Sequence, residues 1–281
     1  MEGTKTMSEQ GWLKLDGKVA VVTGSAAGIG KATAESMAAV GVNVVVADIN
    51  ETSGVKVAED LKARFGGEHI FASCNVTSKD SVDGMVKAAM DAFGHIDILV
   101  NNAGILIPRL LVDPAGKEEL TEDILDKMLA INIKGMFLVA QAVARQMMKQ
   151  ESKGVIVNMT SESSLEGSEG QSVYAATKAA GYNMTRSWAK EMGKQGIRVA
   201  GIAPGIMEAT ELRSEEYERA LAYTRGVTVE QLRASYEKVS IPLGRPGFLS
   251  EVADTICFLA SERGGYIHGT TVCVSGGKSR G

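Results

Sequence analysis

Residues 19–30 read Val-Ala-Val-Val-Thr-Gly-Ser-Ala-Ala-Gly-Ile-Gly. The first four are an apolar run of the kind that forms a buried strand, and the glycines follow where a helix is expected to begin. Glycine lets the backbone approach a pyrophosphate closely, and a helix N-terminus supplies free N–H groups and the positive end of a dipole. The stretch therefore predicts a strand, a tight turn and a helix that together bind a dinucleotide.

Apolar runs and amphipathic segments alternate continuously along the rest of the chain. We expect strands at residues 18–23, 43–47, 69–74, 96–100, 155–159, 198–203 and 271–274. We expect helices at residues 28–40, 51–65, 78–93, 121–150, 172–195 and 250–260. Several strands are continuous apolar runs, which is typical of sheets covered on both faces. The pattern predicts an α/β fold, a Rossmann-type doubly wound parallel sheet of about seven strands with helices on both faces.

The alternation also predicts the domain organisation. We expect a single domain over residues 15–281, preceded by a polar, mobile tail at residues 1–14. Residues 205–241 interrupt the rhythm with a charged segment, which we interpret as a helical insertion that covers the site. Right-handed crossovers bring the carboxyl ends of all the strands to one edge of the sheet, where ligands bind.

Composition excludes several classes of partner. The net charge of −4 and the lack of a basic cluster argue against nucleic acid. No apolar run reaches the roughly 18 to 20 residues that span a bilayer, and no signal-peptide pattern opens the chain. The three cysteines lie in or beside apolar runs, as buried reduced thiols do, and the three histidines share no ligand spacing. We expect a cytoplasmic protein without a metal, membrane or nucleic-acid partner.

A second motif carries acid–base chemistry. Tyr174 and Lys178 lie four residues apart in Tyr-Ala-Ala-Thr-Lys, and Ser161 lies thirteen residues before the tyrosine. Residues at i and i+4 share one face of a helix, so the lysine charge is expected to stand beside the phenol. A tyrosine can remove a hydroxyl proton only if its pKa falls from about 10, and a neighbouring cation lowers it. The motif predicts proton abstraction from an alcohol.

These motifs resemble those of the short-chain dehydrogenases/reductases. The spacing Gly24-x3-Gly28-x-Gly30, the segment Asn101-Asn102-Ala103-Gly104 and the turn Pro204-Gly205 are similar to that family's motifs in the same order, and the resemblance covers residues 15–277. It implies a nicotinamide-dependent oxidoreductase whose catalytic residues are Asn132, Ser161, Tyr174 and Lys178. It further implies that the tyrosine is the base, the lysine holds the nicotinamide ribose, the serine orients the substrate oxygen and the asparagine holds a water.

Asp48 indicates which dinucleotide is used. A carboxylate at the end of the second strand can accept bonds from both ribose hydroxyls, and it repels a 2′-phosphate by about 4 kcal/mol at about 4 Å and an effective dielectric constant of about 20. No basic residue follows it, and Ser25 stands where relatives that use NADP often carry one, so we expect NAD. The alternative is a helix N-cap role for Asp48, which Asn50 can fill instead.

The expected cofactor-binding set follows the resemblance. Asn75 stands where an aspartate commonly binds the adenine amino group, and its side-chain carbonyl can accept the same bond. The full set is Gly24, Ser25, Gly28, Ile29, Gly30, Asp48, Ile49, Asn75, Val76, Asn102, Ala103, Gly104, Tyr174, Lys178, Pro204 and Gly205.

The substrate end is polar. Residues 161–172 read Ser-Glu-Ser-Ser-Leu-Glu-Gly-Ser-Glu-Gly-Gln-Ser, which suits a polyol whose hydroxyls need partners once desolvated. Basic residues in the region can bind a phosphate, and Arg109 is the first choice because it follows the Asn-Asn-Ala-Gly turn. The expected substrate-binding residues are Arg109, Ser161, Glu162, Glu169, Arg213 and Arg280, with Arg225 and Lys278 as further cations.

The substrate region and the ending at 276–281 look like those of bacterial sorbitol-6-phosphate 2-dehydrogenases. This resemblance implies reversible oxidation of D-sorbitol 6-phosphate to D-fructose 6-phosphate with NAD. The alternatives are an unphosphorylated polyol, a 3-oxoacyl substrate, or a non-catalytic dinucleotide-binding redox sensor, which the intact set of four catalytic residues disfavours. The long helices at 121–150 and 172–195 are assembly surfaces in the family, so we expect a homotetramer rather than a dimer.

Overall fold

A parallel sheet of seven strands organises the computed structural model, which describes residues 11–210, 213–238 and 241–279. The strands are β1 (Val19–Thr23), β2 (Asn43–Asp48), β3 (His69–Ser73), β4 (Ile98–Asn101), β5 (Gly154–Met159), β6 (Ile197–Pro204) and β7 (Thr271–Val274). Their order is β3-β2-β1-β4-β5-β6-β7, and every neighbouring pair is parallel. The predicted doubly wound sheet is confirmed.

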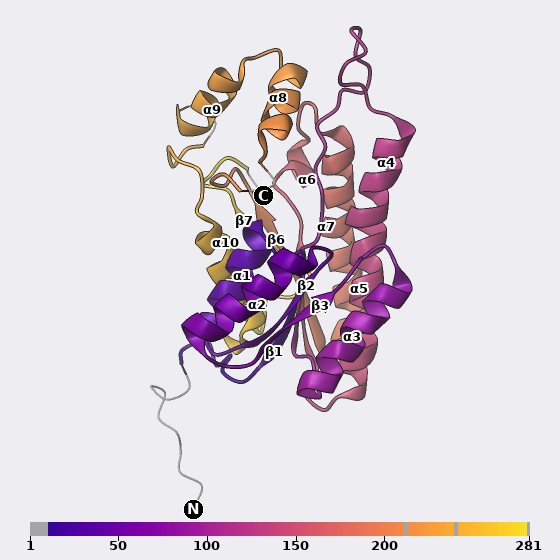
Figure 1. Cartoon of the computed structure of the whole chain (residues 1–281), viewed down its shortest axis with the longest axis vertical. Helices are drawn as coiled ribbons and strands as arrows, with labels where there is room; N and C mark the ends of the chain where they lie inside the picture. The colour runs from indigo at the N-terminus through magenta and orange to yellow at the C-terminus, as the bar shows by residue number, and fades with distance from the viewer. Residues whose placement is uncertain (1–10, 211–212, 239–240, 280–281) are drawn as a thin grey trace, which may run out of the picture.

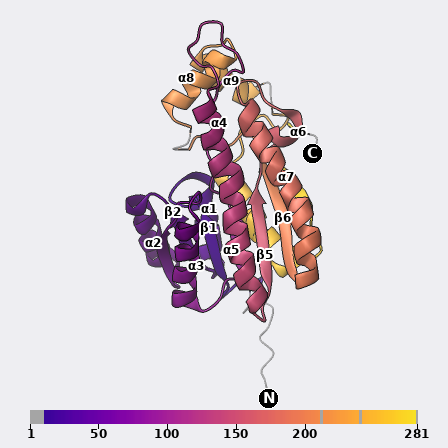
Figure 2. The same ribbon diagram turned by 90° about the vertical axis from the view of Figure 1, so that its right-hand side faces the viewer.

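Helices bury both faces of the sheet (Figures 1 and 2). One face packs α1 (Gly28–Ala39), α2 (Glu51–Phe65) and α10 (Leu249–Ala260), and the other packs α3 (Lys79–Phe93), α5 (Met136–Lys149) and α7 (Ser172–Met192). Alternate residues of β1 serve the two layers, since Ala20 and Val22 join the first apolar cluster while Val19 and Val21 join the second. Both faces need apolar side chains, which explains the unbroken apolar runs in the sequence.

The helix expected at 121–150 contains a π-helical turn. Its parts are α4 (Glu122–Leu129), the turn η1 (Ala130–Gly135) and α5. By length and composition alone, the combined helix Glu122–Lys149 is the described segment that is apolar enough to cross a membrane. Val139, Val143 and Met147 are fully buried in the layer against the sheet, which accounts for that apolar composition.

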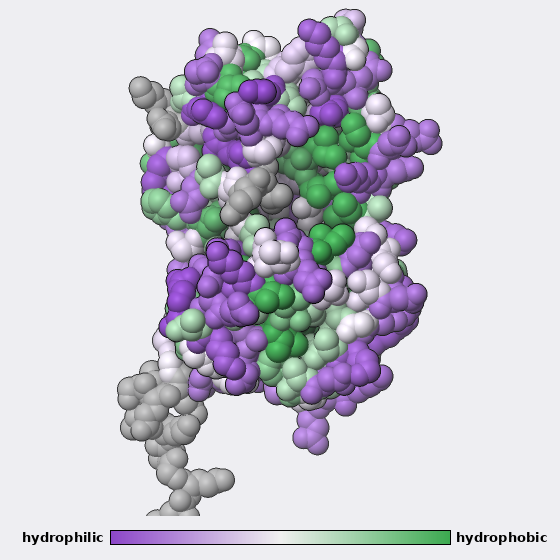
Figure 3. Space-filling model, in the orientation of Figure 1, coloured by the Kyte–Doolittle hydropathy of each residue, from purple (hydrophilic) through white to green (hydrophobic). Residues whose placement is uncertain are grey.

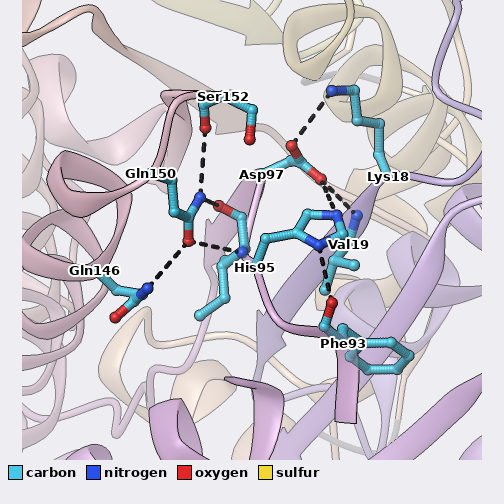
Figure 4. A network of polar contacts seen from close by, with 9 residues as sticks. Lys18, Val19, Phe93, His95, Asp97, Gln146, Gln150 and Ser152 are labelled. Carbon is cyan, nitrogen blue, oxygen red and sulfur yellow. Dashed lines mark hydrogen bonds and ion pairs between the residues drawn. The ribbon is translucent and has the colours of Figure 1, made fainter. Parts of the chain in front are cut away.

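A polar network fixes the sheet at the amino ends of its strands (Figure 4). The buried carboxylate of Asp97 accepts from the Val19 amide at 3.0 Å and from Lys18 Nζ at 3.3 Å, and it lies 3.1 Å from the ring of His95. The side chain of Gln150 binds the backbone of the same loop at both N–H and C=O. The starts of β1 and β4 are thereby held together, opposite the edge where ligands bind.

A cap of two short helices lies beyond the carboxyl ends of the strands (Figure 1). It comprises residues 213–238, with α8 (Glu215–Thr224) and α9 (Val229–Lys238), both of which fall within the segment 205–241. Leu221, Leu232 and Tyr236 form part of its own apolar cluster. Tyr223 of α8 donates to both carboxylate oxygens of Asp113 at 3.1 Å, which ties the cap to the loop that follows β4.

The chain packs against α10 before the first strand. Residues 1–10 of the mobile tail expected at 1–14 lie outside the described residues. Beyond them the Trp12 ring stacks on Phe258, with centroids 6.1 Å apart, and the Arg263 guanidinium lies 5.7 Å from the indole. Lys14 pairs with Glu262 at 3.2 Å. The last residues of the expected tail are therefore part of the packed structure.

Gly30 offers a test of the strand–turn–helix geometry. A Cβ atom at this position would stand 2.1 Å from the Gly24 carbonyl oxygen and 2.6 Å from the Asn102 amide. We predict that Gly30→Ala lowers the free energy of unfolding by about 1–3 kcal/mol, because the turn cannot move away without breaking its own contacts. Urea denaturation measures the change.

The matched control is Gly84→Ala in α3, where a Cβ meets nothing within 4 Å. This variant is expected to gain about 0.5–1 kcal/mol, since alanine costs less backbone entropy than glycine in a helix. Equal stability of Gly30→Ala and the unmodified protein would contradict the proposed constraint.

Candidate active site

A cavity of about 1010 Å³ lies at the carboxyl edge of the sheet, between the strand ends and the cap. In the space-filling view the surface is hollowed at this level (Figure 3). The cavity spans the place where β1 and β4 are neighbours and successive crossovers turn in opposite directions, which is the switch point where doubly wound sheets bind ligands. The fold thus brings the glycine turn and the Ser161–Tyr174–Lys178 group to one site.

The glycine turn is shaped to receive a phosphate. Gly24 and Gly28 have φ of +66° and +56°, a backbone region that favours glycine. The Asn102 side chain donates to the carbonyls of Thr23 at 2.9 Å and Gly24 at 3.1 Å, so it joins the ends of β1 and β4. No side chain caps α1, whose N-cap is Ala27, and its first N–H groups are left for an anion.

Asp48 lies at the end of β2 in the wall of the cavity. Its carboxylate accepts from the amides of Ala26 and Asn50, both at 2.9 Å, which leaves lone pairs for ribose hydroxyls. Asn50 is the N-cap of α2 and accepts from the Ser53 amide at 3.0 Å. The alternative N-cap role for Asp48 is therefore filled by Asn50.

The other expected cofactor residues divide into two groups. Asn75 lines the cavity, but its side-chain carbonyl already accepts from the Thr77 amide at 3.0 Å and hydroxyl at 2.8 Å, so it has no lone pair for an adenine amino group. Ser25, Gly28 and Pro204 do not line the cavity, and the Ser25 hydroxyl is buried and donates to the Val22 carbonyl. The remaining residues of the set line it.

Tyr174 and Lys178 project from α7 into the cavity. Lys178 Nζ lies 5.8 Å from the centroid of the tyrosine ring and donates to the Met159 carbonyl at 3.0 Å. Burial lowers the pKa of Lys178 to about 8. Burial also raises the pKa of Tyr174, a hydrogen bond with Ser161 opposes that rise, and the charge of Glu162 adds to it. The chain alone therefore keeps the phenol protonated, and an additional positive charge is needed to make it a base.

Asn132 lies in the π-helical turn and is buried. Its amide donates to the Ile105 carbonyl at 2.9 Å and the Thr177 hydroxyl at 3.0 Å, while its carbonyl accepts from the Ile105 amide at 2.8 Å. It does not line the cavity. A Cβ on Gly104 would stand 3.3 Å from both Asn132 Oδ1 and Lys178 Nζ, so the asparagine fixes the loop that passes the lysine.

The expected substrate residues are only partly brought together. Ser161, Glu162 and Arg213 line the cavity, whereas Arg109 and Glu169 do not. The expectation that Arg109 is the first choice for a phosphate is wrong in this structure. Its guanidinium pairs with Glu118 at 2.6 Å and donates to the adjacent Pro108 carbonyl, because the loop folds its own carboxylate onto it. Glu169 is exposed outside the cavity, and Arg280 lies outside the described residues.

Sequence reasoning missed other residues of the site. The Gln171 amide donates to the Tyr217 hydroxyl at 3.2 Å, and both residues line the cavity. Tyr217 comes from the cap, and no local signal in the sequence places α8 over α7. The cavity also has an apolar side, opposite in character to the polar segment 161–172. Its residues include Ile105, Leu106, Ile107, Ile131, Met207 and Leu221.

A dinucleotide turn at the switch point, with a serine, a tyrosine and a lysine across the same cavity, defines an oxidoreductase that uses a nicotinamide cofactor. The short chain dehydrogenase family model matches residues 18–220. The chain belongs to this family, the short-chain dehydrogenases/reductases, as its motifs indicated.

Individual relatives agree with this assignment. The chain is 52% identical over 96% of its length to a sorbitol-6-phosphate 2-dehydrogenase of Klebsiella pneumoniae, of which 99% is covered. It is 39% identical over 94% of its length to a 3-oxoacyl-[acyl-carrier-protein] reductase of Thermotoga maritima, of which 99% is covered. A short-chain type dehydrogenase/reductase from Mycobacterium marinum superposes with a TM-score of 0.81 at 32% identity, covering 95% of this chain and 97% of that one.

The buried lysine leads to a stability prediction. Lys178 is 4% exposed, and its pKa falls from 10.5 to about 8, a shift that costs at most about 3 kcal/mol while the lysine is charged. We predict that Lys178→Met stabilises the fold by about 1–3 kcal/mol at pH 7, since methionine fills the space without a charge. Chemical denaturation measures this gain.

The gain has a defined pH dependence. The unfolded lysine binds a proton more tightly than the folded one, so the wild-type stability rises between pH 8 and 10.5. The advantage of Lys178→Met is therefore full below pH 8 and disappears as pH approaches 10.5. Lys190→Met, an exposed position on the same helix, should change stability by no more than about 0.5 kcal/mol. Destabilisation by Lys178→Met at pH 7 would show that the buried charge is compensated.

Proposed function

We propose that this protein oxidises D-sorbitol 6-phosphate to D-fructose 6-phosphate with NAD, and catalyses the reverse reaction. The observation that carries the proposal is the 52% identity to a sorbitol-6-phosphate 2-dehydrogenase, against 39% to a 3-oxoacyl reductase over a similar length. The polar wall formed by Ser161, Glu162 and Gln171 supports a substrate with several hydroxyls.

In this proposal Tyr174 is the base. Its Oη takes the proton of the carbinol hydroxyl, while Ser161 donates a hydrogen bond to the same oxygen. A bound NAD would supply the hydride acceptor for the carbinol carbon and a positive charge beside the tyrosine. Lys178 is charged below its pKa of about 8 and favours the tyrosinate. Asn132 positions the loop beside Lys178 and keeps one carbonyl lone pair for a water.

NAD fits the residues at the other end of the cavity. The uncapped N-terminus of α1 would bind the pyrophosphate, and Asp48 would accept from the adenosine ribose hydroxyls. The basic side chain that a 2′-phosphate needs is not supplied by Ser25, which is buried, nor by Ile49 or Asn50. These features support NAD rather than NADP.

The cofactor choice can be measured directly. The unmodified protein should prefer NAD over NADP by at least about a hundredfold in kcat/KM, since one like-charge pair near the ribose exceeds the roughly 2.7 kcal/mol required. Asp48→Ala should reduce that ratio at least tenfold. Asp60→Ala removes an exposed carboxylate from α2 outside the cavity and should leave the ratio unchanged. Equal use of both cofactors by the unmodified protein rejects the assignment.

The proposed substrate can be tested by measuring NADH formation with a panel of polyols. We predict that D-sorbitol 6-phosphate gives the highest kcat/KM among phosphorylated and unphosphorylated polyols, because the phosphate supplies binding energy that positions the carbinol. 3-Oxoacyl thioesters, assayed with NADH, test the reductase alternative. NADH binding without turnover of any substrate would indicate the redox sensor instead.

Tyr174→Phe tests whether the tyrosine hydroxyl is the base that removes the proton. It removes the hydroxyl and keeps the ring, so it should abolish nearly all turnover while NADH binding, followed by fluorescence, persists. Turnover near that of the unmodified protein would mean that another group removes the proton.

We also propose a cytoplasmic homotetramer built from a single domain, residues 15–281, and without nucleic-acid or membrane partners. Exposed apolar side chains along α4 and α5 support assembly: Leu129, Phe137 and Met148 are 37%, 41% and 36% exposed. Side chains of this kind are usual in subunit interfaces.

No group of three or more potential metal ligands occurs within the described part of the chain, and the proposed chemistry needs none.

A further inference from the structure

Two residues in the cavity wall carry a buried polar atom that has no hydrogen-bond partner among the described residues. These atoms are Glu162 Oε2 and Arg225 Nε. Buried polar groups nearly always have partners, because an unsatisfied one costs desolvation free energy. One of the two atoms is an acceptor and the other a cationic donor, so together they point to a ligand that has hydroxyls as well as a negative charge.

Arg225 has no carboxylate partner among the described residues, unlike the other cations considered for a phosphate, except Arg280, which lies outside them. Arg213 donates from Nε to the buried Glu218 at 2.8 Å, and its guanidinium lies over the ring of Tyr236. Lys278 pairs with Glu162. Within the described part of the chain, the Arg225 guanidinium makes one hydrogen bond, from Nη2 to the Ser168 hydroxyl at 3.2 Å.

The position of Arg225 suits the far end of a sugar-phosphate chain. It follows α8 directly, and its contact Ser168 begins the turn that leads through Gln171 into α7. Gln171 donates to the Tyr217 hydroxyl, and Gln171, Tyr217 and Arg225 all line the cavity. Burial raises the pKa of Tyr217, nearby Tyr174 adds to that rise, and the Arg225 guanidinium opposes it. Tyr217 therefore connects the reacting end of the cavity with the guanidinium.

Glu162 lies at the reacting end. It follows Ser161 directly and contributes to the electrostatics of Tyr174. Burial raises its pKa, and the partnership with Lys278 opposes that rise. A carboxylate paired through one oxygen, with the other left over, is suited to accept from a substrate hydroxyl. The cavity thus offers a hydrogen-bond acceptor near Tyr174 and, beside α8, a guanidinium that has no carboxylate partner among the described residues.

We propose that Arg225 binds the substrate's phosphate, in an orientation that directs the hydroxyls toward Glu162 and the carbinol toward Tyr174. This inference rests on the proposed function and names the residue that recognises the phosphate. A guanidinium has five N–H donors and can bind phosphate through two parallel bonds. The Ser168 hydroxyl, which already lies beside Nη2, can rotate to donate to the same phosphate.

The experiment compares two substrates in each variant. The ratio of kcat/KM for D-sorbitol 6-phosphate to that for D-sorbitol is measured with NAD in the unmodified protein and in Arg225→Gln. We expect the ratio to fall by about thirtyfold or more, the usual loss when one partner of a desolvated charge pair is truncated. Arg225→Lys keeps the charge without the planar fork and should lose less.

The matched control is Arg219→Gln. Arg219 lies on α8, the helix that Arg225 follows, is exposed and pairs with Glu215, so this change should leave the ratio unaltered. A variant that is partly unfolded shows the same proportional loss of kcat/KM for both substrates, so the ratio does not change. A second measurement is inhibition by inorganic phosphate against D-sorbitol 6-phosphate, whose inhibition constant should rise in Arg225→Gln and not in Arg219→Gln.

The outcomes separate this inference from the proposed function. If the unmodified protein turns over both substrates equally well, phosphate recognition and the proposed substrate are both wrong. If it prefers the phosphate and Arg225→Gln keeps that preference and the inhibition constant, the proposed function stands and the role of Arg225 is overturned. The role of Arg225 is also overturned if Arg213→Gln or Lys278→Gln loses the preference for the phosphorylated substrate while Arg225→Gln keeps it.

Discussion

Burial of the sheet on both faces is the constraint on which the rest of this structure depends. Once helices cover the two faces, the strands expose backbone and side chains to ligands only at their ends. Asp97 and Gln150 hold the amino end together with a polar network, and the candidate active site lies at the carboxyl end. There the Asn102 amide holds β1 against β4, and the glycine turn and the α7 residues share one cavity.

The reactive end of that cavity contains features that lower the stability of the fold. Lys178 is buried with a carbonyl rather than a carboxylate as its partner, so its charge is costly and its pKa falls to about 8. The π-helical turn likewise departs from regular helix, and it presents Asn132 to the loop beside the lysine. Such departures often occur at functional sites. The apolar layers on both faces of the sheet supply the stability that offsets them.

Features set by local backbone and periodicity could be predicted from the sequence. The strands were placed within one or two residues, since apolar runs bounded by glycines fix their limits. The glycine turn and the Tyr174–Lys178 pair were identified because each depends on spacing within one turn or helix. The π-helical turn was missed, because one extra residue barely changes the apolar periodicity of α4 and α5.

The residue proposed to bind a phosphate was harder to predict, since the choice depends on which charges the fold pairs. Arg109 and Glu118 are nine residues apart, and only the folded loop shows that they neutralise each other. Arg225 had no distinguishing sequence signal, and only the folded chain places it beside Ser168, with no carboxylate partner in the part that the structure describes. Pairing across elements is a tertiary property, which explains why the catalytic and cofactor ends were clearer than the substrate end.

The bond between Tyr223 and Asp113 has a consequence for how a ligand enters. Asp113 also accepts from the amides of Ala115, Lys117 and Glu118, so it is the organising residue of the loop after β4. Through Tyr223 that loop and α8 share a fixed point, although they are far apart in the chain. Two walls of the cavity are thus mechanically joined, and a displacement that widens the entrance from one side has to carry the other with it or break this bond.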